Sequence, residues 1–316
     1  MPNRYASVLI ASVLCSTAAA ALAQSAPPAP STTVAPLTVQ AAPSPKVIER
    51  QTHTFVQSYA AVPNPEIDQI GRWHDPVCVQ VVGLPQADQA ALIKARIESV
   101  ARAVGLPAPW TTPAGCRANV QIVFTDQPQR IMDTVAKTRE YLLGYYHFHD
   151  RDRLKTVTHP IQAWYVTETR GIGGSAGFIY QVKKEVIDDP ENIPPDGCGD
   201  SRFSACLRSA FYNVFIVADS KVLEGQDLGL VADYLVMQAL SQPRSLEGCN
   251  ALPSVIDRFA KSACPGRDPP DGLTPADAAY LTALYDSDPE GRKASEQSDI
   301  ASGMARILIK AGAGGR

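Results

Sequence analysis

The chain has 316 residues, of which 45% are hydrophobic, and its formal net charge is −3. This composition can bury a substantial core, and it lacks the excess of lysine and arginine that marks a nucleic-acid surface. Once the terminal segments are set aside, the length is compatible with one large or two small domains.

The first 23 residues have the pattern of an export signal. Arg4 supplies a positive charge, residues 8–20 form a short apolar run, and residues 21–23 (Ala-Leu-Ala) fit a cleavage site. An uncleaved membrane anchor is the alternative, but the run is short for a membrane span and no charged stop follows it. We therefore expect a periplasmic or secreted protein with no stable membrane span after the signal is cleaved.

The composition also predicts the domain boundaries. Residues 24–46 are rich in Pro, Ala, Ser and Thr and almost without charge, so we expect a disordered linker. A single globular α+β domain is expected over residues 47–311, with two lobes, 47–200 and 201–311, as an alternative. Residues 312–316 are expected to be a disordered tail.

The cysteines indicate disulfides. The chain has seven cysteines, and six remain after removal of the signal, which contains Cys15. An even number in an exported chain favours disulfide pairing. Because nearest neighbours close the shortest loops, we expect the pairs Cys78–Cys116, Cys198–Cys206 and Cys249–Cys264. Zinc is the alternative, but the C-x-x-C spacing typical of such sites is absent from the sequence.

The first half of the globular region alternates strands and helices. Residues 54–61 are interpreted as a short helix. Residues 76–82 (PVCVQVV) and 119–124 (NVQIVF) are rich in β-branched residues and are predicted to be strands. The apolar spacing predicts helices over residues 86–104 and 129–143. This alternation is typical of an α/β or α+β layer.

The central part of the chain is a strand followed by an apolar helix. Residues 161–167 (IQAWYVT) are predicted to be a strand, with residues 178–186 as its hairpin partner. Residues 212–217 form a further buried strand. The strand leads into residues 228–240, which are apolar over most of the circumference of a helix. We therefore expect a central helix that ends before Pro243.

The C-terminal part is predicted to be helical. Residues 254–259 form a short helical turn, and Thr274 caps a helix whose first position is Pro275. A stripe of apolar residues predicts a last helix over residues 300–311. The expected fold is therefore α+β, with a small mixed sheet covered by helices, a helical C-terminal part and disulfide staples.

Two short motifs are weak candidates for chemistry. Residues 173–177 spell G-x-S-x-G, the pattern of a nucleophile elbow. The residues just before them do not read as a buried strand, those after them are predicted to be a strand and not a helix, and no histidine lies downstream. A Gly-rich hairpin loop is favoured, with Gly173 and Ser175 as weak candidates for ligand binding. His147 and His149 are weak candidates for a metal site, because both side chains of an extended segment point the same way. A polar loop is the alternative.

His74 next to Asp75 is a third candidate, as a base oriented by a carboxylate. Adjacent residues on a strand face opposite sides, which argues against direct pairing. An edge or cap position is therefore favoured for His74.

The central strand, its short loop and the apolar helix are followed by the segments PSVIDRFA and LTPADAAYLTALYD. Together, over residues 203–286, they resemble a family of exported bacterial proteins of unknown function. The matching residues of the second segment are Leu273, Thr274, Asp277, Leu281, Leu284 and Tyr285. Members of that family look like zincin-type metalloproteases, whose helix carries H-E-x-x-H. In that motif two histidines bind zinc and the glutamate activates water.

This chain departs from the zinc motif. At the corresponding positions it has Ala232, Asp233 and Val236, and no histidine follows His159. The resemblance therefore implies a zincin-like scaffold that has lost the motif, with no catalytic residue, metal or cofactor. Asp233 is expected to be a buried acid with a hydrogen-bonded partner, or a residue at the start of the helix.

We predict an exported non-catalytic protein, a degraded metalloprotease-like scaffold that acts as an interaction or structural module. The first alternative is a periplasmic hydrolase whose metal or acid site uses His147 and His149. The second is a small-ligand-binding module at the Gly-rich loop, residues 171–177, with Trp164 and Tyr165 nearby. The partner is unknown, and another exported protein is the expected kind, whereas nucleic acid is not.

Overall fold

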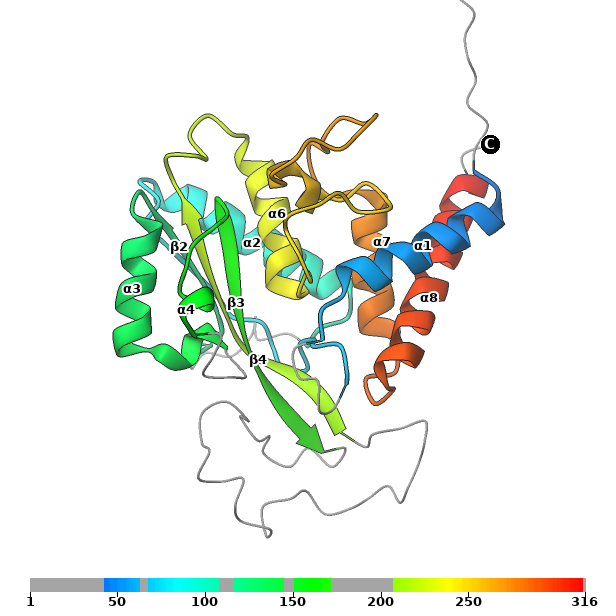
Figure 1. The fold of residues 1–316 in the computed structure, drawn as a ribbon, viewed down its shortest axis with the longest axis horizontal. Coiled ribbons are helices and arrows are strands. Elements are labelled where there is room, and N and C mark those ends of the chain that lie inside the picture. The colour runs from blue at the N-terminus through cyan, green and yellow to red at the C-terminus, as the bar shows by residue number, and fades with distance from the viewer. Residues whose placement is uncertain (1–42, 63–67, 108–115, 145–150, 172–206, 315–316) are drawn as a thin grey trace, which may run out of the picture. The chain divides into compact units, whose positions relative to one another are not determined.

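The computed structural model describes residues 43–62, 68–107, 116–144, 151–171 and 207–314 (Figure 1). They form a mixed α/β structure around a four-stranded sheet, which confirms the predicted mixed sheet. Two of the expected disulfide pairs are present and are described with the functional site below.

The sheet has the strand order β1-β2-β4-β3. Strands β1 (Val79–Val82), β2 (Val120–Thr125) and β4 (Leu207–Asp219) are parallel, and β3 (Ile161–Gly171) pairs with β4 in the antiparallel direction. Both β3 and β4 are longer than predicted, and β4 pairs along the whole of β3. The hairpin partner predicted for β3, residues 178–186, lies outside the described residues.

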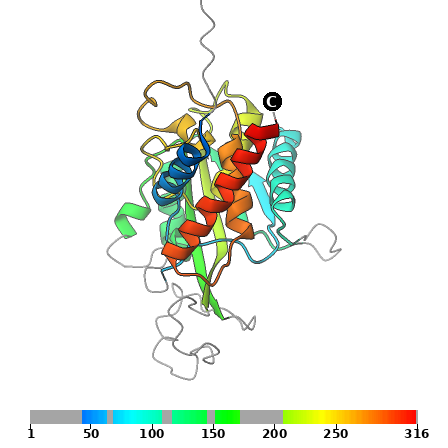
Figure 2. The same cartoon turned by 90° about the vertical axis from the view of Figure 1, so that its right-hand side faces the viewer.

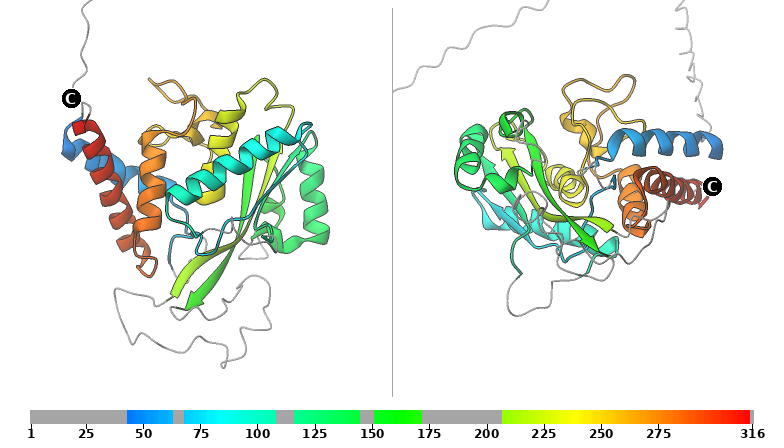
Figure 3. Two further views of the ribbon diagram at one scale, coloured as in Figure 1. Left: turned by 180° about the vertical axis from the view of Figure 1, so that it is seen from behind. Right: turned by 60° about the horizontal axis from the view of Figure 1, so that its bottom comes forward.

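Helices cover both faces of the sheet (Figure 3). Helices α2 (Ala87–Ala103) and α6 (Leu228–Leu240) pack in one apolar core on the first face. Helix α3 (Pro128–Thr138) packs in a second core on the opposite face, beside a 3-10 helix (Glu140–Leu143) and the short α4 (Arg151–Leu154).

The helix predicted over residues 129–143 is therefore divided in two. At Arg139 the backbone leaves the helical region, with φ −143° and ψ 46°, and a separate 3-10 helix follows. Arg139 does not interrupt the pattern of apolar residues, so the sequence shows no break at this point.

Three further helices pack together beyond α6 (Figure 2). These are α1 (Pro45–Tyr59), α7 (Pro275–Asp286) and α8 (Lys293–Gly314). Helix α1 begins earlier than the predicted helix 54–61, with Pro45 in its first turn, where proline is favourable. Helices α7 and α8 approach closely at Gly303, where an added Cβ would lie only 2.9 Å from Ala283 Cβ.

Helix α6 ends inside the protein, where water cannot bind its last carbonyl groups. Carbonyls in the last turn of a helix have no partner within the helix. Side chains from three separate parts of the chain bind them: Tyr165 donates to Gln238 O (2.8 Å), Trp73 Nε1 to Ala239 O (2.7 Å) and Tyr285 to Leu240 O (2.6 Å). The central helix is thus fixed to β3, to the segment before β1 and to α7.

A buried ion pair joins the segment before β1 to the C-terminal helices. Arg72 pairs with Glu296 of α8, and both side chains are almost completely buried. Arg72 Nη1 also donates to Leu284 O (2.5 Å) and Ser287 Oγ (2.8 Å) at the end of α7, where a positive charge is favourable. Burial raises the pKa of Glu296 to about 7, although Arg72 opposes this rise.

The contacts of α6 predict a difference between two buried tyrosines of α7. Replacing Tyr285 by Phe leaves Leu240 O without this donor and lowers the free energy of unfolding by about 1–3 kcal/mol. Tyr280→Phe is the matched control, because the buried Tyr280 hydroxyl has no hydrogen-bond partner among the residues that the structure describes. We expect Tyr280→Phe to leave stability unchanged or to raise it. Urea denaturation measures both, and equal losses would contradict the proposed role of Tyr285.

Candidate functional site

The two positions that would carry the zinc-binding histidines lie in the apolar core. Ala232 and Val236 are both fully buried in the cluster that α6 shares with the sheet. The start of the helix is capped by Asp227, whose side chain accepts a hydrogen bond from Leu230 N (2.9 Å). Neither position therefore faces solvent.

Asp233 joins α6 to two other parts of the fold. Its side chain is 14% exposed, and its Oδ1 accepts a hydrogen bond from Arg96 Nε of α2 (2.5 Å). Its Oδ2 accepts from Leu273 N (2.8 Å), just before α7 begins. A Cβ on Gly272 would lie 2.9 Å from this Oδ2, so the backbone must approach closely here. Both carboxylate oxygens therefore hold the structure together.

Several candidate residues lie outside the described part of the chain. These are His147, His149, Gly173, Ser175 and the pair Cys198–Cys206. Within the described residues, no three His, Cys, Asp or Glu side chains gather in a way that could hold a metal ion.

Two predicted disulfides are confirmed. The Cα atoms of Cys78 and Cys116 are 5.7 Å apart, and those of Cys249 and Cys264 are 5.5 Å apart, both within the range for a disulfide. The first joins the segments that lead into β1 and β2. The second closes the loop between α6 and α7.

Asp75 does not orient His74 as a base. The Asp75 carboxylate binds the guanidinium of Arg170 on β3, with Nη1 to Oδ1 at 2.9 Å, and Arg170 also pairs with Glu168. His74 is partly buried, and its Nε2 has no hydrogen-bond partner within the described ranges. Burial, followed by the charges of Arg208, Arg72 and Arg170, lowers the pKa of His74 to about 3.

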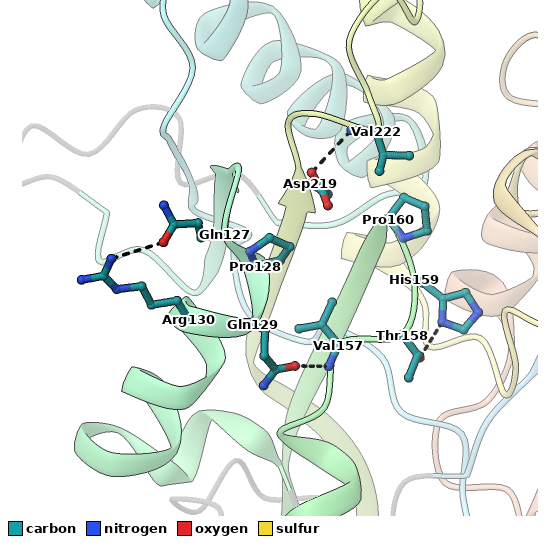
Figure 4. Close-up of a pocket in the computed structure, with 10 residues that line it drawn as sticks. All are labelled: Gln127, Pro128, Gln129, Arg130, Val157, Thr158, His159, Pro160, Asp219 and Val222. Carbon is teal, nitrogen blue, oxygen red and sulfur yellow. Dashed lines mark hydrogen bonds between the residues drawn. The ribbon is translucent and has the colours of Figure 1, made fainter.

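An open groove of about 530 Å³ lies at the carboxyl ends of β2 and β4 (Figure 4). The helix after β2 packs on one face of the sheet and the helix after β4 on the other. In open α/β sheets, ligands bind at the carboxyl ends of neighbouring strands whose connections leave toward opposite faces. The groove is lined by Gln127, Pro128, Gln129, Arg130, Val157, Thr158, His159, Pro160, Asp219 and Val222.

The walls of this groove are fixed by their own hydrogen bonds. Gln129 of α3 donates to Lys155 O (2.9 Å) and accepts from Val157 N (2.9 Å), so it holds the segment before β3 against α3. Asp219 Oδ1 accepts from Lys221 N (3.0 Å) and shapes the turn after β4. The floor includes the apolar side chains of Pro160 and Val222. The groove therefore has a preformed shape.

His159 is the ionisable ring at this groove, but it is mostly buried. Its Nδ1 lies 2.9 Å from Thr158 Oγ1, and its Nε2 lies 3.4 Å from Glu247 Oε1. Burial lowers the pKa of His159, and the charge of Glu247 partly opposes this shift. No local sequence pattern predicts this groove, because its three walls come from residues 127–130, 157–160 and 219–222. The available signal was that two of these segments directly follow predicted strands.

The bonds of Asp233 predict a structural role. Asp233→Ala removes both tethers and lowers the free energy of unfolding by about 1.5–3 kcal/mol, since both bonds involve a charged group. Asp271→Ala is the matched control, because the Asp271 side chain is 96% exposed and forms a surface ion pair with Arg258. We expect the control to stay close to the wild type in thermal and urea denaturation. An unchanged stability of Asp233→Ala would be incompatible with this role.

Comparisons with known proteins return no relative. No protein-family model matches the chain, and no curated protein or solved structure matches it.

Proposed function

We propose that this chain is an exported, non-catalytic protein that acts by binding or by interaction. The observation that carries the proposal is the use of α6. Its two would-be ligand positions, Ala232 and Val236, are filled by buried apolar side chains, and the carboxylate of Asp233 is bound by Arg96 and Leu273 N. The helix is built for stability and places no acid or base in an open cleft.

The zincin-like origin is part of the same proposal and rests on the sequence resemblance over residues 203–286. The structure gives a physical role to two residues of that pattern. Thr274 and Asp277 form a reciprocal capping box at the start of α7. Their presence is accounted for by the folding of α7, and no chemistry has to be assigned to them.

Export is supported by the disulfides. Cysteine pairs persist in oxidising compartments, and two such pairs are present here. None of the helices that the structure describes is both long enough and apolar enough to cross a membrane.

The alternative of a hydrolase with His147 and His149 makes a different prediction about metal. For a non-catalytic protein we expect purified mature chain to contain only substoichiometric zinc and to cleave peptide substrates no faster than the double variant His147→Ala/His149→Ala. Elemental analysis and a fluorogenic peptide assay measure the two quantities. Stoichiometric zinc that the double variant loses would establish the hydrolase instead.

The groove at the ends of β2 and β4 favours a second candidate function, the binding of a small ligand. Its volume of about 530 Å³ falls within the range of small-molecule sites, and its walls combine apolar and polar groups. For this second candidate function we favour a ligand site at the carboxyl ends of β2 and β4. A site at the Gly-rich loop stays a separate prediction, because Gly173 and Ser175 lie outside the described residues.

A pair of valine variants tests the ligand-binding candidate. Trp164 Nε1 donates to Leu154 O, close to the wall formed by Val157, so its fluorescence reports on the groove. We expect a small-molecule panel to contain compounds that change this fluorescence, and Val222→Arg to abolish the change. Val82→Arg should leave it intact, since Val82 is similarly exposed but lies on the edge strand β1. No response to a broad panel, or equal loss in both variants, would count against the groove.

A further inference from the structure

Charged side chains gather at the end of the sheet opposite to the groove. Arg170 of β3 and Arg208 of β4 are directly opposite each other in the strand register. His74 and Asp75 reach the same place on the segment beside β4, which forms a bridge between Arg72 and Ala210. The cluster therefore contains two arginines, the imidazole of His74 and the carboxylates of Asp75 and Glu168.

The two arginines differ in their partners. Arg170 is bound by the carboxylates of Asp75 and Glu168. Arg208 has no carboxylate partner among the residues that the structure describes, and its buried Nε has no hydrogen-bond acceptor. Like charges directly opposite in a sheet are unfavourable, and so is a buried donor without an acceptor. Within the described part of the chain, Arg208 therefore keeps a guanidinium N–H that no acceptor binds.

His74 adds a second group that lacks a partner. Its Nε2 is buried and forms no hydrogen bond with any described residue. Asp75, its neighbour in the sequence, is bound by Arg170. Asp75 binds Arg170, which is directly opposite Arg208, so His74 and Arg208 lie in the same part of the fold. Burial and then the positive charge of Arg208 lower the pKa of His74. Both residues are partly exposed, although Arg208 Nε and His74 Nε2 are themselves buried.

We propose that Arg208 and His74 form a binding site for an oxyanion, either a carboxylate or a phosphate group. The guanidinium offers N–H donors in a planar fork that matches such anions, and a neutral imidazole can donate one further hydrogen bond. Arg170 pairs with both nearby carboxylates and so offsets one of their two negative charges. Burial also raises the pKa of Glu168, which weakens its opposition to a bound anion. The bound anion would also offset the repulsion between Arg170 and Arg208. This site lies apart from the groove and does not depend on the proposed function.

The first test is a titration of the mature chain with inorganic phosphate and with sodium acetate, against sodium chloride at equal ionic strength. The ring resonances of His74 report binding by NMR, and we expect a saturable change with at least one of the two anions. Phosphate should also raise the pKa of His74 by about 1–3, because a negative charge nearby stabilises the imidazolium. The response to each anion shows whether phosphate or carboxylate is the preferred source. No saturable change with either anion overturns the proposal.

The second test uses two arginine variants. Arg208→Gln should weaken the binding at least about tenfold, because a hydrogen bond to a charged group is lost. Arg244→Gln is the matched control, since this exposed arginine lies on the loop after α6, and its affinity should equal that of the wild type. Unchanged affinity in Arg208→Gln overturns the proposal. If that variant does not fold, the wild-type titration decides, because the change must then centre on His74.

Discussion

The rest of the structure depends on the need to satisfy the buried end of α6. This helix is apolar on nearly every side, so the core can surround it, but its last carbonyl groups are then cut off from water. An unsatisfied buried carbonyl costs about 1–3 kcal/mol, and a folded domain has only about 5–15 kcal/mol of net stability. Donors from Trp73, Tyr165 and Tyr285 therefore have to reach the end of α6 together.

In the loop between α6 and α7, buried polar groups also need hydrogen-bond partners, and acidic side chains supply them. The buried Asp277 accepts hydrogen bonds from Ser254 Oγ (2.6 Å) and Val255 N (2.8 Å) in addition to capping its own helix. Asp257 binds Asn250 N (3.0 Å) and pairs with Arg267. Burial raises the pKa of Asp277, and these hydrogen bonds oppose that rise. The acids of the C-terminal part thus stabilise the starts of short helices.

The elements that the sequence predicted well are those with a strong local pattern. The helix at residues 228–240 and the cap at Thr274 are found as expected, because apolar spacing and capping residues act over a few positions. Strand β4 was predicted only over residues 212–217, because polar residues such as Arg208 conceal its first half. Pairing with β3 keeps that half of β4 extended. This pairing leaves no trace in the local sequence pattern.

The candidate sites were harder to predict, since they join distant segments. The ion pair between Arg72 and Glu296 spans 224 positions of the sequence, and the groove is assembled from three separate segments. The weak sequence candidate His74 lies at a polar cluster, but its partners on β3 and β4 were not foreseen. Local patterns predict which elements form, whereas the register of the sheet decides which side chains meet.

Strand β4 connects the groove to the proposed oxyanion site and fixes the distance between them. It is 13 residues long and carries Arg208 near its start and Asp219 at its end. At about 3.3 Å per residue, Arg208 and Asp219 are roughly 35 Å apart along the strand. One strand thus carries the arginine of the proposed oxyanion site near one end and the groove at the other. Two molecules bound at these places would not touch, so a single chain could hold both at once and act as a bridge between them.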